Sequence, residues 1–259
     1  GMSGRKGMSL VRRAIPLVAL YGGRVGTAVV GLLSLPLLYK VLGPSSFGVV
    51  GIILALQALV VMLDLGLAVS TGREAASLSF EARGQIRPLV RHIDRVSLVL
   101  YGSVLIVGLA IATLVGLGVS TATVAATVVG LWALTHQNAC LSGIIGRQDF
   151  VFASANLFGG VLLRYALALI CLYLIAPTVE VFVLAQGAVL LVQVMVTRTR
   201  LIWLAGPLDA DAPAPPRAQI SLALFVMGAA GAAALQLDKP IIGTLAGAAA
   251  VAPYFLAST

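Results

Sequence analysis

The longest stretch of this chain without an acidic side chain, a lysine or an arginine runs from residue 96 to residue 146. As one straight α-helix, its 51 residues would be about 76 Å long, because each residue adds about 1.5 Å. The hydrocarbon core of a bilayer is only about 30 Å thick. The run must therefore fold back on itself, and the turn-forming residues at 116–121 mark the place. This predicts two antiparallel helices, over about 96–117 and 121–144.

Composition places this hairpin and the rest of the chain in a membrane. Of the 259 residues, 60% are hydrophobic and only 10% are charged, and the mean hydropathy is +1.06. A soluble domain carries about 25% charged residues. Because so little charge cannot cover a water-exposed surface, the chain is predicted to be an all-α, polytopic bundle of membrane-spanning helices.

Four further segments are apolar and long enough to span the bilayer. They cover residues 14–39, 47–70, 152–175 and 181–197. A Pro-, Ala- and Asp-rich connector follows, which is too polar to span. The expected domains are a six-helix transmembrane lobe over 1–200, a cytoplasmic linker over 201–218 and the start of a second lobe over 219–259. In that last part, Asp238-Lys239-Pro240 either forms a turn between two helices or lies within one helix.

Basic residues gather between alternate helices. With a cytoplasmic N-terminus, most of the 17 Lys and Arg residues fall on the cytoplasmic side, in keeping with the positive-inside rule. The net charge of +8 is then explained by the basic residues of the cytoplasmic segments. No nucleic-acid partner is expected, because the chain has no basic stripe interleaved with aromatic residues.

Three stretches carry a family resemblance. They are Arg24 followed by Leu42-Gly-Pro-Ser-Ser-Phe-Gly48, Asp64-Leu-Gly66 followed by Arg73-Glu74, and Asp238-Lys-Pro-Ile-Ile-Gly243 followed by Val251-Ala-Pro-Tyr254. In order and spacing, they resemble the polysaccharide flippases (Wzx-type O-antigen and exopolysaccharide exporters) of the multidrug/oligosaccharidyl-lipid/polysaccharide exporter superfamily. The chain departs from the family pattern at Lys40 and Lys239, where arginine is usual, and at Ala252-Pro253, where glycine is usual.

The resemblance implies a MATE-like fold of twelve or fourteen helices in two lobes. This chain would hold the six-helix first lobe, helix seven and the start of helix eight, so it looks like a truncated copy. The implied function is flipping of a lipid-linked oligosaccharide or polysaccharide repeat unit, carried on an isoprenoid pyrophosphate, across the bacterial inner membrane. Membrane lipid and polysaccharide polymerase or assembly proteins are the other implied partners. A multidrug or lipid II-type exporter of the same superfamily is the alternative.

Two arginines interrupt the apolar segments. Arg24 lies about 15 Å into the first helix at helical rise, and Arg164 lies near the middle of the helix over 152–175. A charge at such depth is expensive and marks a function or a structural pair, and transporter substrates bind near the midplane. Since a guanidinium binds phosphate oxygens in pairs, both arginines are predicted to bind substrate. The alternative is internal pairing, for example of Arg24 with Asp64.

Other polar residues within the apolar segments are candidates for coupling or for structural pairing. Asp64 either caps and pairs at the inner end of its helix or couples a cation, and Asp238 with Lys239 forms either a neutral pair or a gate. His136 is either hydrogen-bonded to a neighbouring helix or a proton carrier. Amides at several positions either line a sugar cavity or join helices: Gln57, Asn156, Gln186, Gln193 and Gln236.

Signals for an enzyme are missing from the sequence. There is no Gly-rich phosphate loop and no His-Glu-x-x-His motif, and the predicted outer loops are too short for the catalytic loop of a membrane polymerase or ligase. Cys140 and Cys171 both lie in apolar runs and resemble core residues more than ligands. The prediction is a transporter that is not an enzyme and uses neither a cofactor nor a metal.

Overall fold

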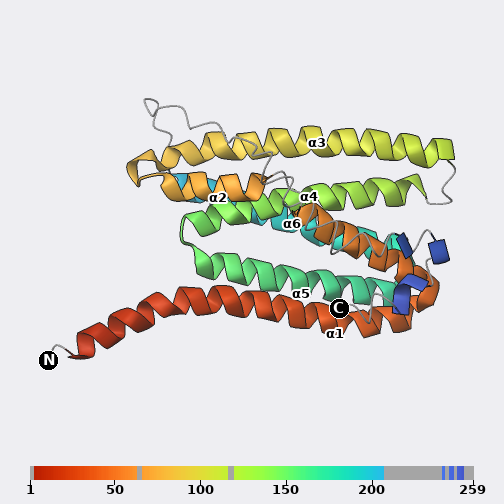
Figure 1. Cartoon of the computed structure of the whole chain (residues 1–259), viewed down its shortest axis with the longest axis horizontal. Helices are drawn as coiled ribbons and strands as arrows, with labels where there is room; N and C mark the ends of the chain where they lie inside the picture. Colours follow the sequence, from red (N-terminus) through yellow and green to blue (C-terminus); the bar gives the residue numbers. More distant parts are fainter. Residues whose placement is uncertain are drawn as a thin grey trace.

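The structure is a computed structural model that describes residues 3–62, 66–115, 120–206, 241–242, 245–247 and 250–253. Every regular element among these residues is a helix, as the composition predicts. In chain order the elements are α1 (Ser3–Met62), α2 (Leu67–Ser77), the 3₁₀ helix η1 (Glu81–Gln85), α3 (Ile86–Val115), α4 (Thr121–Gly146), α5 (Phe150–Leu174) and α6 (Val179–Ala205). The long helices run up and down a single bundle (Figure 1).

Helix α1 is two helices joined at a sharp bend. Gly43 has φ 74° and ψ 169°, which is outside the helical region, and Pro44 follows it. A positive φ suits glycine, which lacks a Cβ. The arm over 3–42 therefore ends at the bend, and the arm over 44–62 returns along the bundle (Figure 1). These arms are the first and second helices that the sequence predicts.

The predicted fold-back of the 96–146 run is confirmed. Helices α3 and α4 lie side by side, and the chain reverses between Val115 and Thr121. Ser120 caps the start of α4, because its hydroxyl oxygen accepts a hydrogen bond from the Thr123 N–H at 3.1 Å. Thr178 caps α6 in the same way, with the Val181 N–H as the donor.

Three boundaries differ from the predictions. Helix α3 begins at Ile86, ten residues earlier than expected, because charged turns at the end of a helix lie outside the apolar segment that hydropathy detects. Helix α6 continues to Ala205 because its last turns are charged in the same way. The predicted second helix is interrupted, since Gly66 has φ 74° and a new helix, α2, begins after it.

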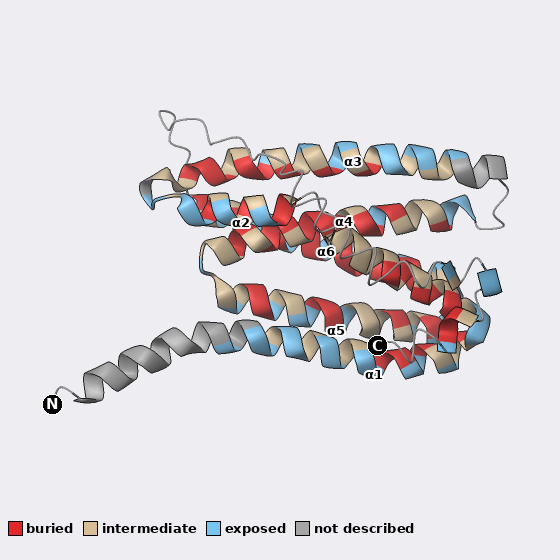
Figure 2. Cartoon of the chain, viewed as in Figure 1, coloured by how far each residue is buried: buried red, intermediate tan, exposed pale blue. Residues whose placement is uncertain are grey.

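The bundle has two main apolar cores, one toward each end. One contains Leu38, Phe47, Leu172 and Phe182. The other contains Ile86, Ile93, Cys140, Ile144 and Leu201. Buried residues concentrate on α4 and α6, whereas residues 86–110 of α3 and 21–42 of α1 expose much of their surface (Figure 2).

Four helices in the described part of the chain are long and apolar enough to cross a membrane: Tyr21–Val61, Ala82–Ala110, Phe150–Leu174 and Val179–Ala205. The first of them contains the bend at Gly43 and so supplies two arms. Helix α4 is absent from this set, since polar residues such as Gln137 lower its hydropathy, but it is largely buried inside the bundle. The outer helices expose large apolar side chains, as expected for a multi-pass membrane protein.

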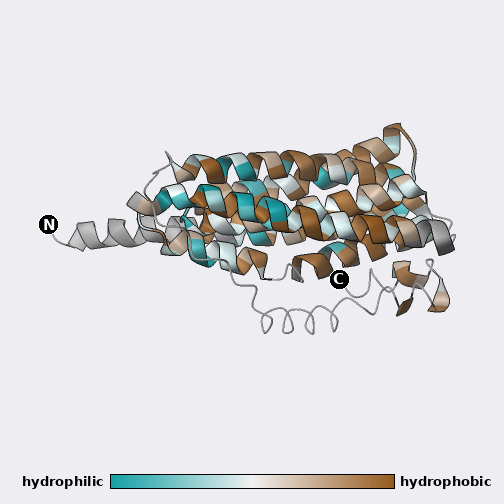
Figure 3. Ribbon diagram, turned by 90° about the horizontal axis from the view of Figure 1, so that it is seen from above, coloured by the Kyte–Doolittle hydropathy of each residue, from teal (hydrophilic) through white to brown (hydrophobic). Residues whose placement is uncertain are grey.

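One end of the bundle is hydrophilic. Helices α2, α4 and α6 end there, and η1, α3 and α5 begin there (Figure 1). Hydrophilic residues gather toward this end in Figure 3. We call it the charged end.

Candidate functional site

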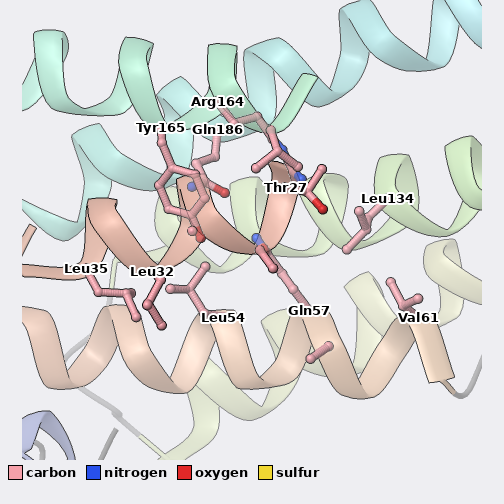
Figure 4. Close-up of a pocket in the computed structure, with 14 residues that line it drawn as sticks. Thr27, Leu32, Leu35, Leu54, Gln57, Val61, Leu134, Arg164, Tyr165 and Gln186 are labelled. Atoms are coloured by element: carbon pink, nitrogen blue, oxygen red, sulfur yellow. The ribbon is translucent and has the colours of Figure 1, made fainter. Parts of the chain in front are cut away.

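A cavity of about 660 Å³ lies between the two arms of α1 and the helices α4, α5 and α6. Its 14 lining residues are Thr27, Ala28, Gly31, Leu32, Leu35, Leu54, Gln57, Ala58, Val61, Leu134, Val161, Arg164, Tyr165 and Gln186 (Figure 4). Most of these side chains are small or apolar, so the wall of the cavity carries few polar groups.

The cavity lies at middle depth, between the two apolar cores. Helix α5 shows this best, because it passes the charged-end core at Ala153, the cavity at 161–165 and the other core at Ala168. The sequence predicts this depth for Arg164, and the structure places Arg164 in the wall of the cavity.

Arg164 is a half-buried cation, and no acid is among the described residues that line its cavity. Its Nε is inaccessible to solvent and has no hydrogen-bond partner in the described part of the chain. The same is true of both amide atoms of Gln186 on α6. In Figure 4, the side chains of Arg164, Gln186 and Gln57 point into the same space. None of the described lining residues is an Asp or a Glu.

Buried polar atoms without partners are costly. Each unsatisfied donor or acceptor destabilises the folded state by about 1–3 kcal/mol, and by more when it is charged. A bilayer raises the cost, because it offers no water to a buried guanidinium. The arrangement therefore suits a polar ligand that brings negative charge to Arg164 and hydrogen-bonding groups to Gln186 and Gln57.

Arg24, the other predicted arginine, lies near this cavity but does not line it. Arg24 precedes the lining residues Ala28, Gly31 and Leu35 by four, seven and eleven residues, so it shares their face of the helix about one turn nearer the charged end. Its side chain is exposed. The alternative pairing with Asp64 cannot be placed, because Asp64 lies outside the described residues.

His136 belongs to a polar network near the charged end. Its Nε2 lies 3.3 Å from Oδ1 of Asp94, and its Nδ1 lies 3.1 Å from the Ser97 hydroxyl. The Arg198 guanidinium donates to both oxygens of Asp94, from Nε at 3.2 Å and from Nη2 at 2.9 Å. This network joins α3, α4 and α6. Sequence reasoning missed Asp94, although a single acid close to Arg87, Arg91 and Arg95 was a usable signal.

Two more arginines at the charged end have partners. Arg200 donates to Oδ2 of Asp149 at 2.7 Å, which ties α6 to the start of α5. Arg147 donates to the Ala75 carbonyl at 3.2 Å and the Leu78 carbonyl at 2.8 Å, so it caps the end of α2.

The amides divide between the two roles considered for them. Gln57 and Gln186 line the cavity. Gln193 on α6 donates to the Asn156 carbonyl of α5 at 3.1 Å and so joins two helices. Gln236, Asp238 and Lys239 lie outside the described residues. Within the residues that are described, no group of three or more His, Cys, Asp or Glu side chains is placed to hold a metal ion.

Comparisons with known proteins give the fold. No family model matches the chain, and no curated protein matches it. Among solved structures, it is similar to a multidrug resistance MATE family transporter of the MOP superfamily in an outward-facing conformation, with a TM-score of 0.62 and 19% identity over 96% of this chain. A MOP superfamily transporter from Pyrococcus furiosus, for which a reversed polarity of the binding pocket is said to suggest a different function, gives a TM-score of 0.52 and 16% identity, also over 96% of this chain.

The described residues form only helices, and the long apolar ones are those of a multi-pass membrane protein. The fold is the MATE-like fold of MOP superfamily transporters, which confirms the predicted fold class. The chain spans 62% of the length of each of the two structures.

Proposed function

We propose that this chain belongs to an exporter that flips a lipid-linked oligosaccharide, carried on an isoprenoid pyrophosphate, across the bacterial inner membrane. The observation that carries the proposal is Arg164, a half-buried cation whose Nε has no partner in the described part of the chain, in a cavity whose described lining contains no acid. A pyrophosphate supplies the paired oxygens that a guanidinium fork binds. The resemblance to polysaccharide flippases in the three sequence stretches supports the same substrate class.

The neutral part of the cavity suits the sugar. Gln57 and Gln186 offer amide donors and acceptors to hydroxyl groups, and Tyr165 offers an aromatic ring. Arg24, one turn nearer the charged end, would meet the headgroup before it reaches Arg164. The two arginines would thus act in succession and not as one clamp.

The charged end faces the cytoplasm in this proposal, because Lys and Arg favour that side of the membrane. In intact cells, an impermeant thiol reagent should fail to label the Arg83→Cys variant and should label Ser45→Cys, in a background without Cys140 and Cys171. The reverse pattern would contradict the orientation.

A multidrug exporter is the second candidate, since one similar structure is a multidrug resistance transporter. A cationic drug would favour an acidic cavity, and Arg164 would repel it electrostatically. The described lining therefore fits an anionic substrate better.

The test compares Arg164→Gln and Arg164→Lys with Arg73→Gln, a control that removes an exposed arginine of α2. Loss of a charge-assisted hydrogen bond is worth about 1.5–3 kcal/mol, so Arg164→Gln should lower export about ten- to hundredfold. Lysine keeps the charge without the fork and should rescue export partly. Export is measured as surface polysaccharide at matched membrane levels of each variant.

Each result has a clear meaning. Normal export by Arg164→Gln would contradict a substrate role for this arginine. The multidrug exporter would be favoured by two results together. The parent protein would produce no surface polysaccharide, and Arg164→Gln would raise the efflux of a cationic dye.

A further inference from the structure

A second cavity, of about 230 Å³, lies at the charged end between the start of α3 and the end of α6. Its lining consists of Arg87, Val90, Arg91, Arg198 and Ile202. It shares no lining residue with the central cavity. Three of its five residues are arginines, so we call it the arginine groove.

The three arginines differ in how far their charge is balanced. Arg198 is neutralised by its two hydrogen bonds to Asp94. Arg87 donates from Nε and Nη2 to the Gly206 carbonyl, at 3.3 and 3.1 Å, and a carbonyl carries no net charge to balance it. Arg91 is exposed and forms neither an ion pair nor a hydrogen bond with any residue that the structure describes.

Arg87 and Arg91 stand one helical turn apart on the same face of α3. Like charges four residues apart repel each other and destabilise the helix. An anion between them would replace this repulsion with two attractions. Phosphate suits the position, because a guanidinium can donate two parallel hydrogen bonds to phosphate oxygens.

The groove continues into an apolar, exposed surface. Leu98 follows Arg91 by seven residues, so it lies on the same face of α3 toward the middle of the bundle, and it is 65% exposed. A ligand with a phosphate in the groove would therefore have its apolar part beside Leu98. That combination is the chemistry of a phospholipid at the edge of the bilayer.

We propose that the arginine groove binds the headgroup phosphate of an anionic glycerophospholipid, at a site separate from the central cavity. Val90 and Ile202 form the apolar floor, and Arg87 and Arg91 bind the phosphate. Basic pockets between membrane helices are known to hold lipid headgroups in this way.

The experiment is native mass spectrometry of the purified chain in a neutral detergent, with phosphatidylglycerol or phosphatidylcholine of identical acyl chains. Bound phosphatidylglycerol should exceed phosphatidylcholine several-fold. Arg91→Gln should lower phosphatidylglycerol binding about fivefold, and Arg87→Gln with Arg91→Gln about thirtyfold, from the typical contribution of one basic residue near an anionic lipid surface. Arg91→Lys should keep part of the binding.

The matched control is Lys40→Gln with Arg73→Gln, which removes the same net charge from two exposed residues that do not line the groove. Equal losses in the control and in the groove variant would mean general charge attraction and overturn the proposal. Unchanged binding in Arg91→Gln would overturn it as well. This single variant decides the matter if the double variant does not fold, since Arg91 is exposed.

A last arm separates the lipid from a soluble phosphate. Thermal unfolding is followed in sodium phosphate and in sodium chloride of the same ionic strength. Stabilisation by phosphate that is lost in Arg91→Gln, together with no preference for phosphatidylglycerol, would assign the groove to a soluble phosphate and overturn the lipid proposal.

Discussion

The charged end and the central cavity both contain arginines that are partly withdrawn from water, but these arginines differ in whether an acid pairs with them. At the charged end, Arg198 meets Asp94 and Arg200 meets Asp149 in direct hydrogen bonds. In the cavity, the Nε of Arg164 and the amide of Gln186 have no partner in the described part of the chain. The two pairs at the charged end therefore join helices, whereas these polar atoms at the cavity are left without a protein partner among the described residues.

The difference separates two reasons for keeping a charge in a membrane protein. A paired charge fixes how helices meet, and its loss should unfold or loosen the bundle. An unpaired charge reduces stability and is retained because it binds something. The free energies of unfolding of matched variants therefore distinguish the two kinds of charge.

The largest effect on stability is expected at Asp94. Asp94→Leu leaves Arg198 and His136 without their shared acid, and because Asp94 and Arg198 are partly exposed, the loss should be about 2–3 kcal/mol, below that of a fully buried pair. The double variant Asp94→Leu with Arg198→Met should recover most of it. The free energy of unfolding in mixed detergent, followed by circular dichroism, measures both, and an unchanged value for Asp94→Leu would show that the network is not a structural joint.

Packing gives the next contrast. A Cβ on Gly146, at the end of α4, would collide with the Gly72 carbonyl oxygen and touch Ala75, so Gly146→Ala should destabilise the bundle by about 1–3 kcal/mol. Gly31 lines the central cavity, and a Cβ there would meet nothing within 4 Å. Gly31→Ala should therefore leave stability unchanged or raise it by up to about 1 kcal/mol, because alanine is the better helix former. If both variants lose the same stability, the cavity wall is as tightly packed as the charged end.

The smallest effect is expected at Arg164, with the opposite sign to Asp94. Arg164→Met replaces a half-buried charge, whose Nε has no partner among the described residues, with an apolar side chain, and should raise the free energy of unfolding by about 1 kcal/mol. The same unfolding assay applies. If Arg164→Met instead lowers the free energy of unfolding by about 2 kcal/mol or more, Arg164 has a structural partner, because breaking a buried ion pair has an effect of that size.

Much of the fold could be predicted from the sequence. The predicted helices over 121–144 and 152–175 lie within two residues of α4 and α5, because length and apolarity are local properties that a bilayer converts directly into spans. The prediction was wrong about the start of α3 and about an unbroken second helix. Arg87, Arg91 and Arg95 lie in helical turns that extend past the apolar core, and hydropathy takes such turns for a loop.

The candidate site was predicted only in part. Arg164 stood out because a charge in an apolar segment is rare, and Gln57 and Gln186 were left between two roles that only their positions could separate. The meeting of Asp94 with His136 and Arg198 joins residues up to 104 positions apart in the chain. No local pattern in the sequence contains that information.

Length and apolarity alone predict that this chain spans a membrane as helices, roughly where each helix lies, and that Arg24 and Arg164 interrupt the apolar segments. Which polar residues have partners emerges only from the packed bundle. Asp94 does not stand out among the neighbouring arginines of the sequence and Arg164 does, but helix packing brings Arg198 and His136 to the first and a cavity to the second. Pairing depends on which faces of distant helices meet, and those faces are fixed only when the whole bundle packs.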